Sequence, residues 1–241
     1  MREAFAVLFD MDGVLFDSER AVLAVWQELA AEQGLGDIEE TFIRCVGTNK
    51  VRTAEIFRAA FPALDFARFD GEARRRFQTR WGGGRLPVKP GAEAVLSALR
   101  RRGVPLALAS STESAVVRQE LAEAGLLPFF DALVGGDRVK RSKPDPEIFL
   151  RAAAGLGAEP ARCFVIEDSF NGIRAAAAAG MRPLMVPDLL APDDEMRRLA
   201  EAILPDLAAA EEYLRERETV SPIHPGERSG EDSRSRRRYI E

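Results

Sequence analysis

The sequence contains a single histidine, His224, among 241 residues. Ser-His-Asp triads, His-Glu-x-x-His zinc sites and phosphohistidine intermediates all require imidazole, so this scarcity excludes most of that chemistry. The two cysteines, Cys45 and Cys163, lie too far apart for a Cys-x-x-Cys motif and provide no disulfide framework. A reducing, cytoplasmic setting is therefore expected. If the chain is an enzyme, carboxylates are expected to carry the catalysis.

Other absences limit the partners of the chain. No apolar run approaches the roughly 18 residues of a membrane span, and residues 4–9 are too short for the apolar part of a signal peptide. The net charge of −5 gives no general reason to expect nucleic-acid binding. Neither G-x-x-x-x-G-K-[ST] nor G-x-G-x-x-G occurs, so nucleotide sites of those types are not expected. Nothing in the sequence requires more than a monomer.

Hydrophobic periodicity indicates the fold class. Short apolar runs, typical of buried strands, alternate with amphipathic helical patterns, and this alternation predicts an α/β fold with a parallel sheet covered by helices on both faces. The expected strands are residues 5–9, 104–109, 132–134, 163–166 and 183–186, and the expected helices are residues 92–101, 113–124, 146–156 and 172–179.

One segment interrupts the alternation. Between about residues 20 and 86 three helical patterns (21–33, 51–61 and 66–81) follow one another with no strand between them, which predicts a helical insertion after the first strand. Glycines 82–84 close it, either as a hinge or as an ordinary loop. We therefore expect an α/β core at 1–18 and 86–214 and a helical cap domain at 19–85.

The last 27 residues differ in composition. Residues 215–241 contain only four apolar side chains, Val220, Ile223, Tyr239 and Ile240, and are expected to be disordered or loosely attached. The run of arginines at 236–238 is compatible with nucleic acid or anionic lipid, but a solvated tail is the preferred interpretation.

Two carboxylates directly follow the first strand. Asp10 and Asp12 lie at positions i and i+2, so they project to the same side, and Gly13 then lets the chain turn sharply. Such a pair is costly unless a cation, a shared proton or a substrate stabilises it. An isolated D-x-D in a capped turn with exposed acids is the alternative.

Three further segments carry polar groups at expected strand ends or helix starts. Ser110 and Ser111 precede a helix and suit an anion, although serine is also a common helix cap. Lys143 stands just before another helix, in a chain with only four lysines, and is either a phosphate-neutralising group or part of a proline-rich helix lead-in. Glu167 and Asp168 end the fourth run and offer hard oxygen ligands that favour Mg²⁺.

The expected topology joins these segments. In an open parallel sheet the carboxyl ends of all strands lie along one edge, where ligands bind. Asp10, Ser110 and Asp168 follow strands directly and should meet there, within reach of Lys143.

The motifs DMDGVLFDSE, LASST, SKPDPEIFL and IEDSFNGIRAAAAAG resemble those of the haloacid dehalogenase superfamily, specifically its β-phosphoglucomutase-like branch of sugar-phosphate phosphatases and mutases. The resemblance covers residues 4–215. It implies that Asp10 is the nucleophile that takes the phosphoryl group and that Asp12 is the general acid and base. It also implies that Ser110 binds the phosphate with the Ser111 backbone and that Lys143 balances charge. The metal ligands it implies are Asp10, the Asp12 carbonyl and Asp168, with Glu167 as a further ligand or an indirect one.

Departures from the family pattern narrow the expected activity. Asp12 argues against carbon–halogen cleavage, because true dehalogenases lack this second acid. Phosphonoacetaldehyde hydrolases also lack it and need a Schiff-base lysine in the cap, where only Lys50 stands. β-Phosphoglucomutases use a cap histidine near the position of Val22, and the expected cap of this chain contains no histidine.

We therefore expect a Mg²⁺-dependent phosphatase of a small phosphorylated sugar or sugar alcohol. A mutase of the β-phosphoglucomutase type is the first alternative, and a non-catalytic protein that binds a phosphorylated metabolite is the second. The cap residues expected to contact the substrate are 44–50 and 74–81.

Overall fold

A computed structural model describes residues 5–46, 50–83 and 85–219. In these residues six strands form one parallel sheet with the order β3-β2-β1-β4-β5-β6. The predicted α/β fold with a parallel sheet is confirmed. The strands are β1 (Ala6–Phe9), β2 (Leu106–Ala109), β3 (Ala132–Val134), β4 (Cys163–Glu167), β5 (Arg182–Met185) and β6 (Ala202–Ile203).

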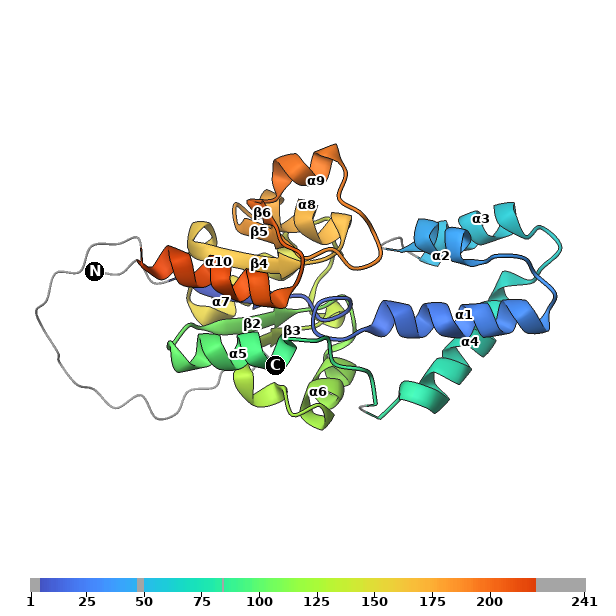
Figure 1. The fold of residues 1–241 in the computed structure, drawn as a ribbon, viewed down its shortest axis with the longest axis horizontal. Coiled ribbons are helices and arrows are strands. Elements are labelled where there is room, and N and C mark those ends of the chain that lie inside the picture. Colours follow the sequence, from blue (N-terminus) through green and yellow to red (C-terminus); the bar gives the residue numbers. More distant parts are fainter. Residues whose placement is uncertain (1–4, 47–49, 84, 220–241) are drawn as a thin grey trace, which may run out of the picture.

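Helices cover both faces of this sheet (Figure 1). Side chains alternate along β1, so Val7 and Phe9 pack into the hydrophobic cluster under one set of helices and Ala6 and Leu8 into the cluster under the other. All four are buried on both sides, as the unbroken apolar run predicts. The first face carries α5 (Ala92–Arg101), α6 (Ser114–Glu123) and α10 (Leu207–Thr219), and the second carries α7 (Glu147–Leu156) and α8 (Phe170–Ala178).

A group of helices inserted after β1 extends from the sheet on the right of Figure 1. It has a hydrophobic cluster of its own, centred on Trp26, whose ring makes edge contacts with Phe42, Phe57 and Phe69 at centroid distances of 5.1 to 5.7 Å. Of its helices, α2 was not predicted, because seven residues are too few to show a clear period. The helices are α1 (Ser18–Glu32), α2 (Glu39–Cys45), α3 (Lys50–Ala60) and α4 (Phe66–Trp81).

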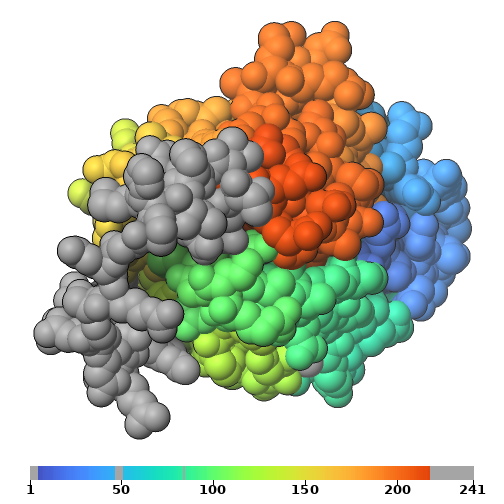
Figure 2. Space-filling model, turned by 60° about the vertical axis from the view of Figure 1, so that its left-hand side comes forward, coloured from blue at the N-terminus to red at the C-terminus, as the bar shows by residue number. Residues whose placement is uncertain are grey.

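The C-terminal part differs most from the sequence-based expectation. Neither α9 (Asp194–Leu199), β6 nor α10 was predicted, and α10 continues to Thr219. Residues 215–219, which we assigned to the tail by composition, are therefore helical. Their helix buries Leu207, Ala210 and Leu214 against the sheet, and Figure 2 shows it lying against α5. Residues 220–241, with His224, lie outside the described residues.

Short 3-10 helices complete the described elements, at η1 (Leu127–Phe129), η2 (Gly136–Arg138) and η3 (Pro160–Arg162). Within the described ranges no helix is long and apolar enough to cross a membrane.

Candidate active site

The first motif leaves β1 at the carboxyl edge of the sheet. The Asp10 N–H still donates to the Ile166 carbonyl of β4 at 3.0 Å, so the strand geometry fixes where Asp10 lies. The chain then turns at Gly13, whose φ of +79° suits glycine far better than other residues. Asp10 is 7% exposed, so its carboxylate is held at the edge of the sheet but largely removed from water.

Lys143 joins Asp10 to Glu167. Its ammonium donates to Asp10 Oδ1 at 2.5 Å, to Glu167 Oε1 at 2.8 Å and to the Ala109 carbonyl at 3.2 Å. These three bonds match the three N–H donors of an ammonium. The position therefore suits balancing the charge of the two carboxylates more than a separate bond to a phosphate.

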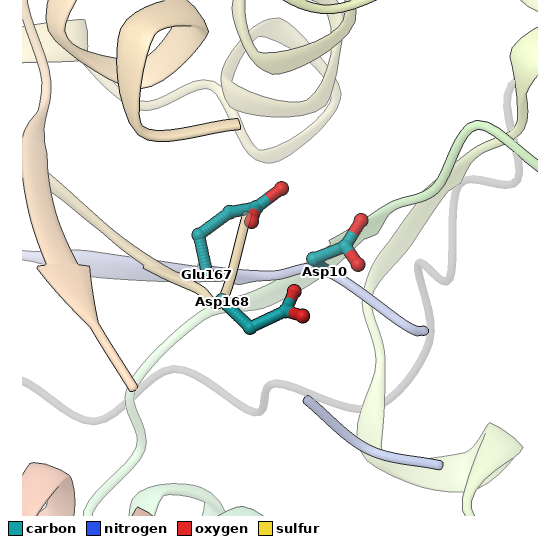
Figure 3. Close-up of side chains that lie close together, drawn as sticks. All are labelled: Asp10, Glu167 and Asp168. Carbon is teal, nitrogen blue, oxygen red and sulfur yellow. The ribbon is translucent and has the colours of Figure 1, made fainter. Parts of the chain in front are cut away.

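Asp10, Glu167 and Asp168 could together hold a metal ion. One carboxylate oxygen from each lies within 4.8 Å of the others, and Figure 3 shows the three groups around a common region at the ends of β1 and β4. A Cβ built on Gly13 would lie 2.2 Å from Asp168 Oδ2, so the backbone approaches this carboxylate as closely as only glycine allows. Hard oxygen donors from several segments fit Mg²⁺.

The three carboxylates differ in how many of their oxygens already accept hydrogen bonds. Glu167 Oε1 accepts from Lys143, and its Oε2 accepts from the Ser169 N–H at 2.6 Å, so both oxygens are already engaged. An indirect role beside the metal therefore suits Glu167 better than a direct bond. Asp10 and Asp168 remain the stronger predicted ligands.

Burial has shifted the titration of these acids. It raises the pKa of the Asp10 carboxyl, and the Lys143 ammonium only partly opposes this. Burial and then the nearby Glu167 raise the pKa of Asp168 well above its usual value. The raised pKa values mean that ionising these two buried carboxyls costs free energy. A bound cation would lower that cost.

Asp12 is not part of the metal-binding group, and its side chain is held by two hydroxyls. Ser18 Oγ donates to Asp12 Oδ1 at 2.7 Å, and Thr112 Oγ1 donates to Asp12 Oδ2 at 3.1 Å. Ser18 begins α1 and Thr112 follows β2, so two segments far apart in the sequence position this acid. Only the backbone carbonyl of Asp12, and not its side chain, is predicted to bind the metal.

The two predicted phosphate-binding serines lie differently. Ser110 is completely buried, its N–H donates to the Val134 carbonyl, and its Oγ accepts from the Thr112 N–H at 3.0 Å. Ser111 is exposed and lines a cavity together with Asp10, Lys143 and Asp168. Both roles stay predictions.

Two cavities meet at Asp12 and Glu19, which line both. The first, of about 500 Å³, contains the carboxylates at the edge of the sheet. The second, of about 640 Å³, lies among the inserted helices and includes part of each of the two expected substrate-contacting stretches, at Cys45 and Val46 and at Arg74, Phe77 and Gln78. Residues 47–49 of the first stretch lie outside the described residues.

Sequence reasoning assigned no individual role to Ser18, Thr112, Glu19 or Asp188. The first three lie inside or next to the quoted motifs, so the motifs located them without showing what they contact. Asp188 follows β5 by three residues, and the same sheet-edge rule that selected Asp168 could have found it.

Replacing Gly13 by alanine is expected to lower any activity of this site by at least about 100-fold, because the new Cβ would displace the Asp168 carboxylate. The matched control is Gly34→Ala, since Gly34 has a φ of +65° but nothing within 4 Å. It should lose about 1 kcal/mol of stability with no change in activity. Turnover and thermal unfolding of both variants check this, and equal activities would contradict it.

The chain is similar in sequence to known proteins. Residues 6–180 match the haloacid dehalogenase-like hydrolase family. The fructose-1-phosphate phosphatase YqaB of Escherichia coli is 36% identical over 187 residues, which are 75% of this chain and 96% of that protein. A phosphorylated carbohydrates phosphatase of Thermotoga maritima is 33% identical over 180 residues, 73% of this chain and 82% of the relative.

A solved structure shares both fold and sequence. A HAD family hydrolase from Deinococcus radiodurans, crystallised with bound phosphate and sodium, is 32% identical with a TM-score of 0.78, and the match covers 92% of this chain and all of that one. The match to the family over residues 6–180 includes β1, the inserted helices and β4, and therefore every predicted site residue. The chain belongs to the haloacid dehalogenase-like hydrolase family.

Proposed function

We propose that this chain is a Mg²⁺-dependent phosphoric monoester hydrolase that acts on a small sugar phosphate or sugar-alcohol phosphate through an aspartyl phosphate at Asp10. Membership of the family supports a hydrolase, and relatives named as phosphatases of phosphorylated carbohydrates support the substrate class. One observation carries the proposal. Asp10, Asp12, Lys143 and Asp168 line a single cavity at the edge of the sheet.

In the first step an Asp10 oxygen attacks phosphorus, and the bond from phosphorus to the leaving oxygen breaks. A carboxylate approaching a phosphate dianion meets repulsion of about 4 kcal/mol per charge pair at 4 Å and an effective dielectric constant of about 20. The Lys143 ammonium, 2.5 Å from Asp10, offsets part of this. Asp12 donates a proton to the leaving alkoxide, so the products are an alcohol and aspartyl phosphate.

In the second step Asp12, now ionised, takes a proton from water as the water attacks the phosphorus of aspartyl phosphate. This releases inorganic phosphate and restores the Asp10 carboxylate. The hydrogen bonds from Ser18 and Thr112 hold the Asp12 carboxylate in place for both transfers. A Mg²⁺ ion held by Asp10, Asp168 and the Asp12 carbonyl supplies charge neutralisation and orients the phosphoryl oxygens when it is bound.

The cap cavity is the proposed place for the leaving group. Its walls combine apolar side chains, among them Trp26 and Phe42, with polar ones such as Arg74 and Gln78. A sugar has apolar C–H faces and polar hydroxyls, so both kinds of wall suit it. We propose that the helical domain at 19–85 closes over this substrate on the α/β core at 1–18 and 86–214.

Hydrolysis remains preferred over mutase turnover. Val22, near the position where the resemblance implies a mutase histidine, lines the cap cavity and has no group that could activate a sugar hydroxyl. A non-catalytic binding protein is the remaining alternative, and it is disfavoured because every catalytic position is filled.

A substrate panel tests the proposal. Sugar phosphates and sugar-alcohol phosphates are incubated with the protein and Mg²⁺, and phosphate release is compared with that of the Asp10→Asn variant. We expect release from at least one of them. Isomer formation that depends on a bisphosphate activator would favour the mutase, and tight binding without turnover would favour the binding protein.

A further inference from the structure

A second group of carboxylates lies beside the predicted metal site. One oxygen each from Glu19, Asp168 and Asp188 lies within 4.8 Å of the others. The three come from separate segments: the first turn of α1, the end of β4 and the loop after β5. Carboxylate oxygens gathered this closely from three segments could hold one metal ion between them.

Two oxygens of this group have no hydrogen-bond partner within the described part of the chain. They are Glu19 Oε2 and Asp188 Oδ2, and both atoms are buried. The Asp188 side chain is only 1% exposed, and its other oxygen accepts from Lys89 Nζ at 2.6 Å and from Arg20 Nε at 3.2 Å. Those two bonds fix the carboxylate and leave Oδ2 with free lone pairs. Burying such an oxygen unpaired is costly, and a cation would remove that cost.

The local charge also points to a cation. The two carboxylate groups and the ion pairs joined to them contain six acids and three bases, a net charge of −3 when all are ionised. A single divalent ion leaves −1, and a phosphate dianion would bring this to −3 again. The acids are Asp10, Asp17, Glu19, Glu167, Asp168 and Asp188, and the bases are Arg20, Lys89 and Lys143.

We propose that Glu19, Asp168 and Asp188 bind a second hard divalent cation, with Asp168 shared between this site and that of Asp10. All three donors are carboxylate oxygens, which is the chemistry that Mg²⁺, Mn²⁺ and Ca²⁺ prefer. Because Glu19 belongs to the first cap helix and Asp188 to the α/β core, the ion joins the two. This site is independent of which substrate the enzyme hydrolyses.

Counting bound Mn²⁺ tests the proposal. The full chain is titrated with Mn²⁺ alone, and free ion is measured by electron paramagnetic resonance. We expect two ions per chain for the unchanged protein and one for Asp188→Asn and for Glu19→Gln. One ion or none in the unchanged protein, or two in both variants, would overturn the proposal.

Asp17→Asn is the matched control. Asp17 lies 3.3 Å from Lys89 and 3.5 Å from Arg20, so it shares the ion pairs of Asp188 but is outside the carboxylate group. It should still bind two ions, and loss of one would show that total charge, not this site, governs binding. Because Asp188 is buried, thermal unfolding checks that each variant is folded, and Glu19→Gln gives an independent result. Phosphate release measured on the same samples reports separately on the proposed function.

Discussion

The Asp10→Asn variant should release phosphate at least about 10³-fold more slowly than the unchanged protein from every substrate that the unchanged protein hydrolyses. In the unchanged protein Lys143 donates to Asp10 Oδ1 at 2.5 Å. The amide of asparagine is nearly isosteric with the carboxylate, so its oxygen can still accept this hydrogen bond. What is lost is the proposed nucleophile, since a neutral amide oxygen does not displace an alkoxide from phosphorus. The variant should therefore fold and still bind inorganic phosphate.

Two measurements distinguish this loss from a general defect. Asp194→Asn removes an exposed acid at the start of α9 and should leave turnover unchanged. Borohydride reduction of protein quenched during turnover should convert an aspartyl phosphate at position 10 into homoserine, detectable by mass spectrometry. If Asp10→Asn retained more than about 1% of the activity, Asp10 would not be the nucleophile.

The Lys143→Met variant should lose stability as well as activity. Lys143 is 7% exposed and lies between Asp10 and Glu167, whose side chains are 10% and 1% exposed, so its removal leaves two buried carboxylates without their partner. Breaking a buried ion pair on one side costs about 3 to 5 kcal/mol. Turnover should fall by about 100-fold or more, because the repulsion between Asp10 and the phosphate is no longer offset.

The sign of the pH dependence follows from the same contacts. Burial lowers the pKa of Lys143, but the adjacent Asp10 and Glu167 carboxylates outweigh it and raise the pKa above the usual value for lysine. A group whose folded pKa is raised contributes stability that is complete below its unfolded pKa and lost only as pH rises toward the folded value. Deprotonation of Lys143 should therefore not reduce the stability difference between the unchanged protein and Lys143→Met as the pH rises through the neutral range.

Added Mg²⁺ should recover part of the stability of Lys143→Met, because a cation at the proposed site of Asp10 and Asp168 would replace part of the missing charge. The control is Lys140→Met, which changes an exposed lysine three residues away and should alter neither stability nor turnover. Denaturant unfolding at pH 7.5 with and without Mg²⁺, together with turnover, provides the comparison. Equal stabilities of the two variants would show that Lys143 is not needed to compensate the buried carboxylates.

Strand periodicity predicted the sheet because its central strands are buried on both faces. The runs at β1, β2 and β4 are continuously apolar, and such runs occur where helices cover both sides of a sheet. The same reasoning missed β6, which has two half-buried residues, and α10, whose last turns are rich in charge. Composition placed residues 215–219 in a tail, whereas they continue α10, the helix whose Leu207, Ala210 and Leu214 pack into the hydrophobic cluster on one face of the sheet.

The sequence by itself determined the fold class, the inserted helices and the set of acids at the sheet edge. It could do so because a parallel sheet brings the carboxyl ends of its strands together whatever the details of packing. Residues that follow strands, such as Asp10 and Asp168, are therefore located by counting along the chain.

The tertiary structure decided which atoms contact one another. Asp12 is hydrogen-bonded to Ser18, six residues away, and to Thr112, one hundred residues away. Asp188, in the loop after β5, lies near Glu19 of α1. These contacts depend on how the inserted helices are placed on the sheet, which side-chain packing sets and local periodicity does not encode. For the same reason the sequence predicted one metal site at this edge, and only the arrangement of the folded chain indicated a second.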